Sequence, residues 1–158
     1  MGKLETTHTP LNELTPHPNN VRQGDIGAII ESLKHHGQYR PIVAQQSTRH
    51  ILAGNHTWKA AKALKWPTIA VTYIDCDDEQ ALRILLTDNR LSDLASYDDS
   101  GLTELLTHLM STEQGLTGTG FDGDELDDLI KLTDTPLPNP TNAVTPEACP
   151  NCGYTPNT

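Results

Sequence analysis

One stretch of the chain combines the residue types that bind phosphate. Gly54 follows the apolar run 51–53 and precedes a segment rich in alanine and lysine, which predicts a strand, a tight turn and a helix. The first turn of a helix presents free N–H groups and a partial positive charge to an anion. Asn55 and Thr57 are candidate N-caps, and Lys59 adds positive charge. Taken alone, however, a single glycine before a helix is explained better by an ordinary strand–helix turn.

The segments around this turn predict alternating short strands and helices. Apolar residues at helical spacing follow Asp25 and stop at Gly37, which predicts a helix with a favourable cap at each end. Residues 1–9 are polar, and we expect them to be loose. Predicted strands occupy residues 11–14, 41–44, 50–53 and 67–74. Predicted helices occupy residues 25–36, 55–65 and 77–90.

The remainder of the chain predicts a helical extension and an irregular tail. Two helical patterns, over 102–110 and 124–132, flank a loop rich in glycine and threonine. Residues 133–148 are rich in proline and lack periodicity, which is typical of a linker. We therefore expect domain boundaries near residues 94 and 132, with a short cysteine-containing tail over 149–154.

Charge is distributed unevenly along the 158 residues, whose formal net charge is −10. Residues 1–74 carry eight Lys/Arg against four Asp/Glu, whereas residues 75–158 carry three against seventeen. This balance argues against a non-specific duplex-DNA binder, but it allows a nucleotide or DNA held by one basic face. No apolar run approaches the length of a membrane span, and the N-terminus lacks a signal-peptide core. We expect a soluble, cytoplasmic protein without a membrane partner.

Several separated motifs occur in the order found in one protein family. They read LTPHPNNVR at 14–22, SLKHHGQYRPIV at 32–43, GNHTWKAA at 54–61, LTDNRLSDLASYD at 86–98 and GFD at 120–122. Together they resemble the ParB N-terminal, or ParB/sulfiredoxin-like, domain, in the branch found in phages beside DNA methyltransferases. The resemblance implies an α/β (α+β) domain over 11–94, with a small mixed, partly closed sheet and surrounding helices, followed by a helical extension.

The resemblance also implies a ligand and the residues that bind it. In the family, the glycine-led motif binds the phosphates of CTP, and relatives use ATP, so a nucleotide with Mg²⁺ is the expected cofactor. The expected partners are a nucleotide or DNA, together with a DNA methyltransferase or another phage protein in the host cytoplasm. The ligand-binding residues that match are Gly54, Asn55, His56, Thr57, Lys59, Arg22, Gln38, Arg40, Asn89 and Arg90. His56 and Asp88 are the candidates for a catalytic role.

The chain departs from the family pattern at the glycine turn. Asn55 stands where sulfiredoxins need a cysteine and where ParB proteins have a glutamate, so sulfiredoxin chemistry is not expected. His56 and Thr57 replace paired arginines, which removes the bidentate contact to phosphate and favours weaker binding or a different nucleotide. Three hypotheses stay open: a nucleotide- or DNA-binding domain, a metal-dependent nuclease or nucleotide-dependent phosphotransferase, and an interaction module whose pocket is empty.

Cys149 and Cys152 form half of a zinc-ribbon motif. A structural zinc site needs four ligands, and this chain has no second pair of closely spaced cysteines. Two chains that each contribute a pair would share one Zn²⁺ and form a homodimer. The alternative is a flexible tail without metal.

Overall fold

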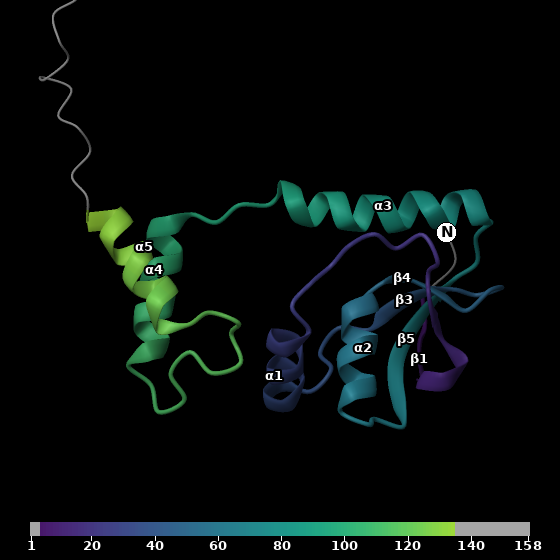
Figure 1. Cartoon of the computed structure of the whole chain (residues 1–158), viewed down its shortest axis with the longest axis horizontal. Coiled ribbons are helices and arrows are strands. Elements are labelled where there is room, and N and C mark those ends of the chain that lie inside the picture. Colours follow the sequence, from purple (N-terminus) through teal and green to yellow (C-terminus); the bar gives the residue numbers. More distant parts are fainter. Residues whose placement is uncertain (1–3, 135–158) are drawn as a thin grey trace, which may run out of the picture.

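The computed structural model describes residues 4–134, which form a mixed sheet, flanking helices and a separate helical pair (Figure 1). The strands are β1 (Thr6–Pro10), β2 (Thr15–Pro16), β3 (Ile42–Gln45), β4 (His50–Ala53) and β5 (Thr68–Ile74). The α-helices are α1 (Ile26–His36), α2 (Asn55–Ala63), α3 (Asp78–Leu94), α4 (Asp99–Met110) and α5 (Gly123–Asp134). The predicted mixed α/β fold is confirmed.

The sheet has the strand order β1-β5-β3-β4-β2. β3 pairs parallel with β5 and antiparallel with β4, and the short β2 extends the sheet by pairing parallel with β4. Figure 1 shows α2 against the sheet with α1 beside it, while α3 runs across the sheet near β4. The core lies between the sheet and the α1–α2 pair, where Ile42, Ile51 and Val71 are almost completely buried.

Two expectations for the N-terminal segment are wrong. Residues 6–9, part of the segment expected to be loose, form edge strand β1 together with Pro10. This strand pairs antiparallel with β5 from Thr6↔Thr72 to Pro10↔Thr68. The predicted strand at 11–14 is instead a 3₁₀ turn, η1 (Leu11–Glu13). Because residues three apart share a side in a 3₁₀ turn, Leu11 and Leu14 can both enter the core.

Helix α3 is longer than the sequence indicates, because it continues to Leu94 rather than ending near residues 88–90. The expected stop contains no glycine or proline, so nothing interrupts the backbone there. Ser92 Oγ donates to the carbonyl of Asp88 within the helix. Asp88 and Asn89 therefore lie inside a regular helix and do not cap it.

Helices α4 and α5 stand apart from the sheet in Figure 1 and pack mainly on each other. Leu106, Leu116 and Leu126 form their small core, which is supported by partly buried neighbours such as Phe121. Both helices begin before the predicted residues, at Asp99 and Gly123, and α5 reaches Asp134. The remainder of the proline-rich linker and the cysteine tail lies outside the described residues. None of the helices between residues 4 and 134 has the length and apolar character of a membrane span.

Candidate functional site

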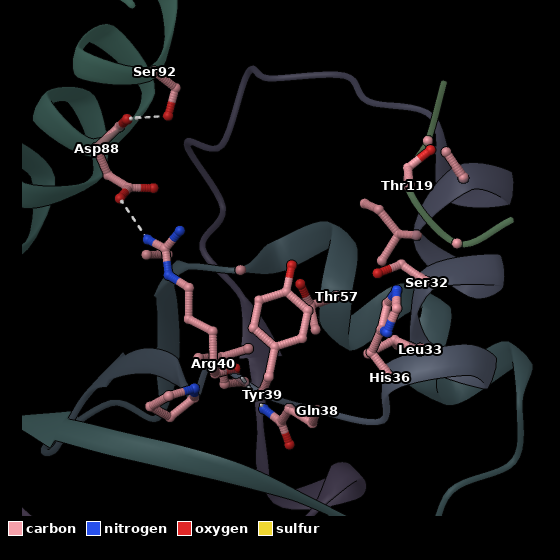
Figure 2. A pocket seen from close by; sticks show the side chains of 18 residues that line it. Ser32, Leu33, His36, Gln38, Tyr39, Arg40, Thr57, Asp88, Ser92 and Thr119 are labelled. Carbon is pink, nitrogen blue, oxygen red and sulfur yellow. Dashed lines mark hydrogen bonds and ion pairs between the residues drawn. The ribbon is translucent and has the colours of Figure 1, made fainter. Parts of the chain in front are cut away.

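A cavity of about 630 Å³ lies where α1, α2, α3 and the loop before α5 converge (Figure 2). Its lining combines apolar helix residues with a small set of hydroxyl, imidazole, amide and charged groups. The polar and charged lining side chains are Ser32, His36, Gln38, Tyr39, Arg40, Thr57, Asp88, Ser92 and Thr119. Gly54 lines the same cavity at the start of α2, so the glycine turn singled out in the sequence lies at the pocket.

Gly54 is required at this turn for two reasons. Its backbone is left-handed, with φ of 87° and ψ of 25°, a conformation that side chains other than glycine adopt at a cost. A Cβ atom at this position would also lie only 2.5 Å from Cγ2 of Ile42. Gly54 itself is the N-cap of α2 and no side chain caps the helix, so the expectation that Asn55 or Thr57 caps it is wrong. The first N–H groups of α2 consequently remain available beside the pocket.

Thr57 and Asn55 follow Gly54 but face different surroundings. Thr57 lines the pocket. Asn55 is buried, and its Nδ2 donates to the carbonyl of Ile51 at 3.2 Å. Within the described residues, its Oδ1 is buried without a hydrogen-bond partner. The Asn55 side chain is thus directed to strand β4 and is absent from the pocket lining.

His56 and Lys59 do not line the pocket. The His56 ring lies against Gly24, because a Cβ atom added to Gly24 would be 3.3 Å from two atoms of the imidazole. Partial burial, followed by the charges of Lys59 and Arg22, lowers the pKa of His56 below its ordinary value, although a hydrogen bond with the Arg22 backbone opposes the shift. The neutral form is therefore favoured at neutral pH, which weakens His56 as a cationic phosphate contact.

Arg40 and Asp88 face each other across one side of the pocket. The guanidinium Nη2 of Arg40 lies 3.8 Å from Oδ1 of Asp88, and Figure 2 shows the two side chains pointing toward one another. The Arg40 side chain is 77% exposed, so this is a weak contact that an anion can replace at little cost. Among the described residues, Arg40 is the one Lys or Arg side chain that lines the pocket.

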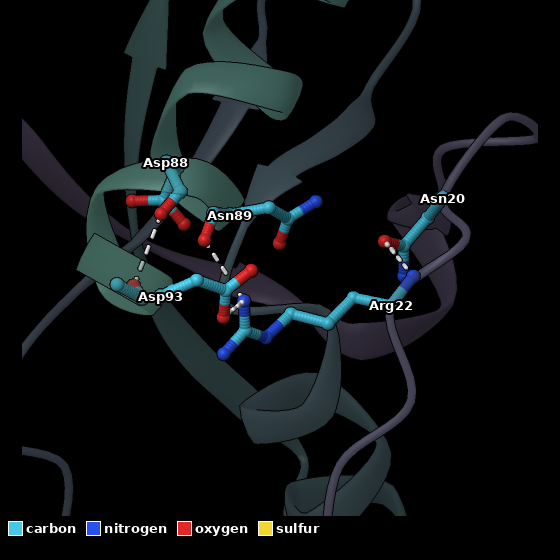
Figure 3. A network of polar contacts seen from close by, with 6 residues as sticks. Asn20, Arg22, Asp88, Asn89 and Asp93 are labelled. Atoms are coloured by element: carbon cyan, nitrogen blue, oxygen red, sulfur yellow. Dashed lines mark hydrogen bonds and ion pairs between the residues drawn. The ribbon is translucent and has the colours of Figure 1, made fainter. Parts of the chain in front are cut away.

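Arg22 is held by the C-terminal half of α3 and not by the pocket (Figure 3). Its Nη1 donates to Oδ1 of Asp93 at 2.7 Å and to the carbonyl of Asn89 at 2.9 Å. The backbone N–H of Arg22 donates to Oδ1 of Asn20 at 3.4 Å. Asn89 contributes its backbone to this network, and neither Asn89 nor the exposed Arg90 lines the pocket.

Gln38 lines the pocket, but its amide is used to bind strand β5. Its Oε1 accepts from the N–H of Ala70 at 2.7 Å, and its Nε2 donates to the carbonyl of Ala70 at 2.9 Å. These two bonds fix the segment before β3, so that Tyr39 and Arg40 project at the pocket mouth. Gln38 therefore positions its neighbours, a function that short-range sequence patterns do not reveal.

The sequence reasoning missed one whole wall of the pocket. Ser32 and His36 reach it from α1, Tyr39 from the following segment, and residues 118–120 from the loop before α5. The sequence contains a weak signal for this wall, because the glycine- and threonine-rich loop is longer than a simple helix–helix turn requires. No local pattern indicates that this loop returns to α1.

Residues 4–134 contain no group of three His, Cys, Asp or Glu side chains placed to hold a metal ion. Cys149 and Cys152, the candidate zinc ligands, lie outside the described residues. Cys76 is free and partly buried, and burial together with the carboxylates of Asp77, Asp75 and Asp78 raises the pKa of its thiol. The thiolate is disfavoured there, which does not suit a nucleophile or metal ligand.

Comparison with known proteins places this arrangement in a family. The profile of the ParB N-terminal domain matches residues 3–90. The chain is 31% identical over 85 residues to the Escherichia coli (strain K12) ParB-like nuclease domain-containing protein YnaK, covering 51% of this chain and 97% of that protein. It is also 27% identical over 85 residues to the "Probable chromosome-partitioning protein ParB" of Helicobacter pylori, covering 50% of this chain.

A solved structure shows the same fold. The C-terminally truncated chromosome-partitioning protein ParB of Caulobacter crescentus, complexed with CTP-γ-S, superposes with a TM-score of 0.68 at 20% identity, covering 85% of this chain and 81% of that one. The present chain nevertheless spans only 29% of the Helicobacter pylori protein. The match of the family profile to more than half of the chain, with its glycine turn and flanking motifs in place, establishes that this protein belongs to the ParB N-terminal domain family.

Proposed function

We propose that the pocket binds a nucleoside triphosphate, either CTP or ATP with Mg²⁺, in a protein that acts on DNA. The observation that carries the proposal is the pocket at the N-terminus of α2, which no side chain caps, with Thr57 and Arg40 in its lining. A helix N-terminus attracts anions through its free N–H groups and its dipole. Thr57 adds a hydroxyl donor and Arg40 adds a guanidinium, which is the side chain best suited to phosphate.

The size of the pocket and the fold of a structural neighbour support this ligand class. A cavity of about 630 Å³ is within the range of about 300–1,000 Å³ that is usual for small-molecule and cofactor sites. The Caulobacter crescentus ParB of similar fold was solved with CTP-γ-S. At the two positions where the family has paired arginines, the present chain has His56 and Thr57. Of these two residues, only Thr57 lines the pocket. We therefore expect weaker binding than the arginine-containing motif gives.

The acidic side of the pocket gives Asp88 a role in this proposal. Asp88 pairs with Arg40 in the structure, so an incoming phosphate would take over the guanidinium and leave the carboxylate facing the ligand. A carboxylate beside triphosphate oxygens is a usual Mg²⁺ ligand. The side chains of six other candidates lie outside the pocket lining and would have to rearrange to contact the nucleotide: Asn55, His56, Lys59, Arg22, Asn89 and Arg90.

Calorimetry with CTP, ATP, GTP and UTP, each with and without Mg²⁺, tests the proposal. We expect one nucleotide to bind, and at 100 times its Kd to stabilise the fold by about 2.7 kcal/mol in a thermal-shift assay. Arg40→Ala should weaken that binding roughly tenfold to a hundredfold, because a hydrogen bond to a charged group is worth about 1.5–3 kcal/mol. Thr57→Val, which keeps the shape and removes the hydroxyl, should weaken it less.

Arg83→Ala is the matched control. Arg83 is as exposed as Arg40, 75% against 77%, and it also pairs with a carboxylate, but it lies on α3 away from the pocket lining. This variant removes the same charge and should bind nucleotide like the parent protein. The proposal fails if no nucleotide binds, or if Arg83→Ala weakens binding as much as Arg40→Ala does.

A second candidate function is hydrolysis or transfer at the same site. The relative YnaK is named for a ParB-like nuclease domain, and Asp88 is a carboxylate on the pocket wall. Release of phosphate, or nicking of DNA, that requires Mg²⁺ and is lost in Asp88→Ala would support this function. Absence of binding to nucleotide and to DNA at low salt would instead favour a protein-interaction module. A phage origin, a DNA methyltransferase partner and a zinc-linked homodimer remain proposals from sequence.

A further inference from the structure

The loop before α5 is built to approach α1 closely. The N–H of Gly118 donates to Oε1 of Glu31 at 2.9 Å. Gly118 has a φ of 80° and is buried, and a Cβ atom there would lie 2.8 Å from Nε2 of His36 and 3.1 Å from Cβ of His35. A Cβ atom at position 118 would therefore force the His36 ring or the loop to shift, and the positive φ would add backbone strain. Glycine is needed at this point for contact as well as for backbone conformation.

The same loop is anchored firmly to the helical pair. The N–H and Oγ1 of Thr119 both donate to the carbonyl of Leu116, and the N–H of Phe121 donates to Oγ1 of Thr119. Leu116 is buried in the core that joins α4 and α5, and Phe121 packs against that core. A displacement of this loop from α1 would consequently involve the helical pair.

One end of the pocket is thus shared between two parts of the molecule. Residues 118–120 line it together with Ser32 and His36 of α1, and Figure 2 shows Thr119 and Ser32 on the side of the pocket away from Asp88. Figure 1 shows the helical pair standing apart from the sheet, with this loop extending toward α1. The wall formed by residues 118–120 exists only while the loop is docked.

We propose that residues 118–120 form a wall of the nucleotide site and that Glu31 and Gly118 are the positioning residues that hold this wall in place. The inference rests on the proposed nucleotide binding. Nucleotide affinity then depends on docking of the α4–α5 pair, and by thermodynamic reciprocity a bound nucleotide strengthens that docking. The ligand gains a complete site, and the helical pair gains a fixed position on α1.

The test compares CTP affinity and loop protection in matched variants of the full chain. Glu31→Ala removes the acceptor of the Gly118 N–H, whereas Glu31→Gln retains a carbonyl oxygen in the same place. Gly118→Ala introduces the clash with His36. We expect Glu31→Ala and Gly118→Ala to weaken CTP binding by roughly fivefold or more, the usual scale of coupling between sites, and Glu31→Gln to restore most of it. Hydrogen exchange over residues 116–121 should slow when CTP binds to the parent protein.

Gly115→Ala controls for backbone strain in the same segment. Gly115 has a φ of 56°, but its added Cβ would meet only Met110 Sδ, at 3.9 Å, and the residue does not line the pocket. This variant should reduce stability and leave the Kd for CTP unchanged. Unaltered CTP binding in both Glu31→Ala and Gly118→Ala would overturn the inference while leaving the proposed function intact. Failure of the parent protein to bind any nucleotide would instead overturn the proposed function.

Discussion

The α/β unit and the α4–α5 pair differ sharply in how much core each has. Ten buried residues from β3, β4, β5, α1, α2 and η1 with its flank form the core cluster of the α/β unit, whereas three buried leucines form that of the helical pair. Since apolar burial is the main favourable term in folding, we expect the pair to be the less stable part. The pocket has its floor on the stable unit and one wall on the less stable one.

The two regions also differ in charge, and the difference favours a small anion over duplex DNA at the pocket. Residues 95–134 carry ten Asp/Glu against a single lysine, whereas residues 1–74 carry an excess of Lys/Arg. An acidic helical pair repels an extended polyanion that approaches from its side. A triphosphate could still contact the α2 N-terminus and Arg40, because both belong to the α/β unit.

Truncating one core residue in each region should produce the largest contrast. Ile51→Ala removes a fully buried side chain from β4, and we expect a loss of about 2–5 kcal/mol in the free energy of unfolding of the whole protein. Leu106→Ala in α4 should instead accelerate hydrogen exchange within residues 99–134 and leave the α/β unit protected. Thermal denaturation combined with residue-resolved hydrogen exchange measures both effects. Equal loss of protection everywhere in Leu106→Ala would show that the two regions fold as one cooperative unit.

Gly54→Ala should have the next largest effect, and it should be confined to the α/β unit. The left-handed backbone costs a residue with a side chain about 1–3 kcal/mol, and contact with Ile42 adds to that cost. Gly120→Ala provides the control, because Gly120 has a similar φ of 84° and no atom within 4 Å of an added Cβ. Chemical denaturation should show a greater loss for Gly54→Ala. Equal losses would mean that packing on Ile42 contributes nothing.

Weakening the contact between Arg22 and Asp93 should reduce the free energy of unfolding by less than Gly54→Ala does. Asp93→Asn removes the charge of a partly exposed pair, for which about 1 kcal/mol is an upper expectation. Because exposed pairs are screened by salt, the difference from the parent protein should shrink as ionic strength rises. The loop that carries Arg22 should exchange faster while the helical pair is unaffected. A stability difference independent of salt would indicate that the pair acts through packing and not through charge.

The sequence predicted the elements of the α/β unit better than it predicted their contacts. Helix α1 was predictable because Asp25 and Gly37 mark its ends locally, and the glycine turn was predictable because Gly54 lies between a strand and a helix. Strand β1 was missed because its polar residues gain order only by pairing with β5. The side chains of Gln38, Asn55 and Arg22 also find their partners elsewhere in the fold, which local spacing cannot show.

Acid should destabilise the α/β unit slightly through two histidines whose pKa values are lowered by folding. Partial burial is the main cause for both His56 and His17, with the charges of Lys59 and His50, respectively, as the next. Below about pH 6.5, the ordinary value for histidine, the unfolded chain binds protons more readily than the folded one. Stability from these groups is therefore complete above that pH and declines as pH falls toward the lowered values.

His56→Gln should flatten this loss of stability at low pH. In the parent protein, hydrogen exchange should show the acid destabilisation in α2 and not in α4 or α5. A decline that is unchanged in His56→Gln and His17→Gln would remove the histidines as its cause, and a decline centred on the helical pair would reverse the expected contrast between the two regions.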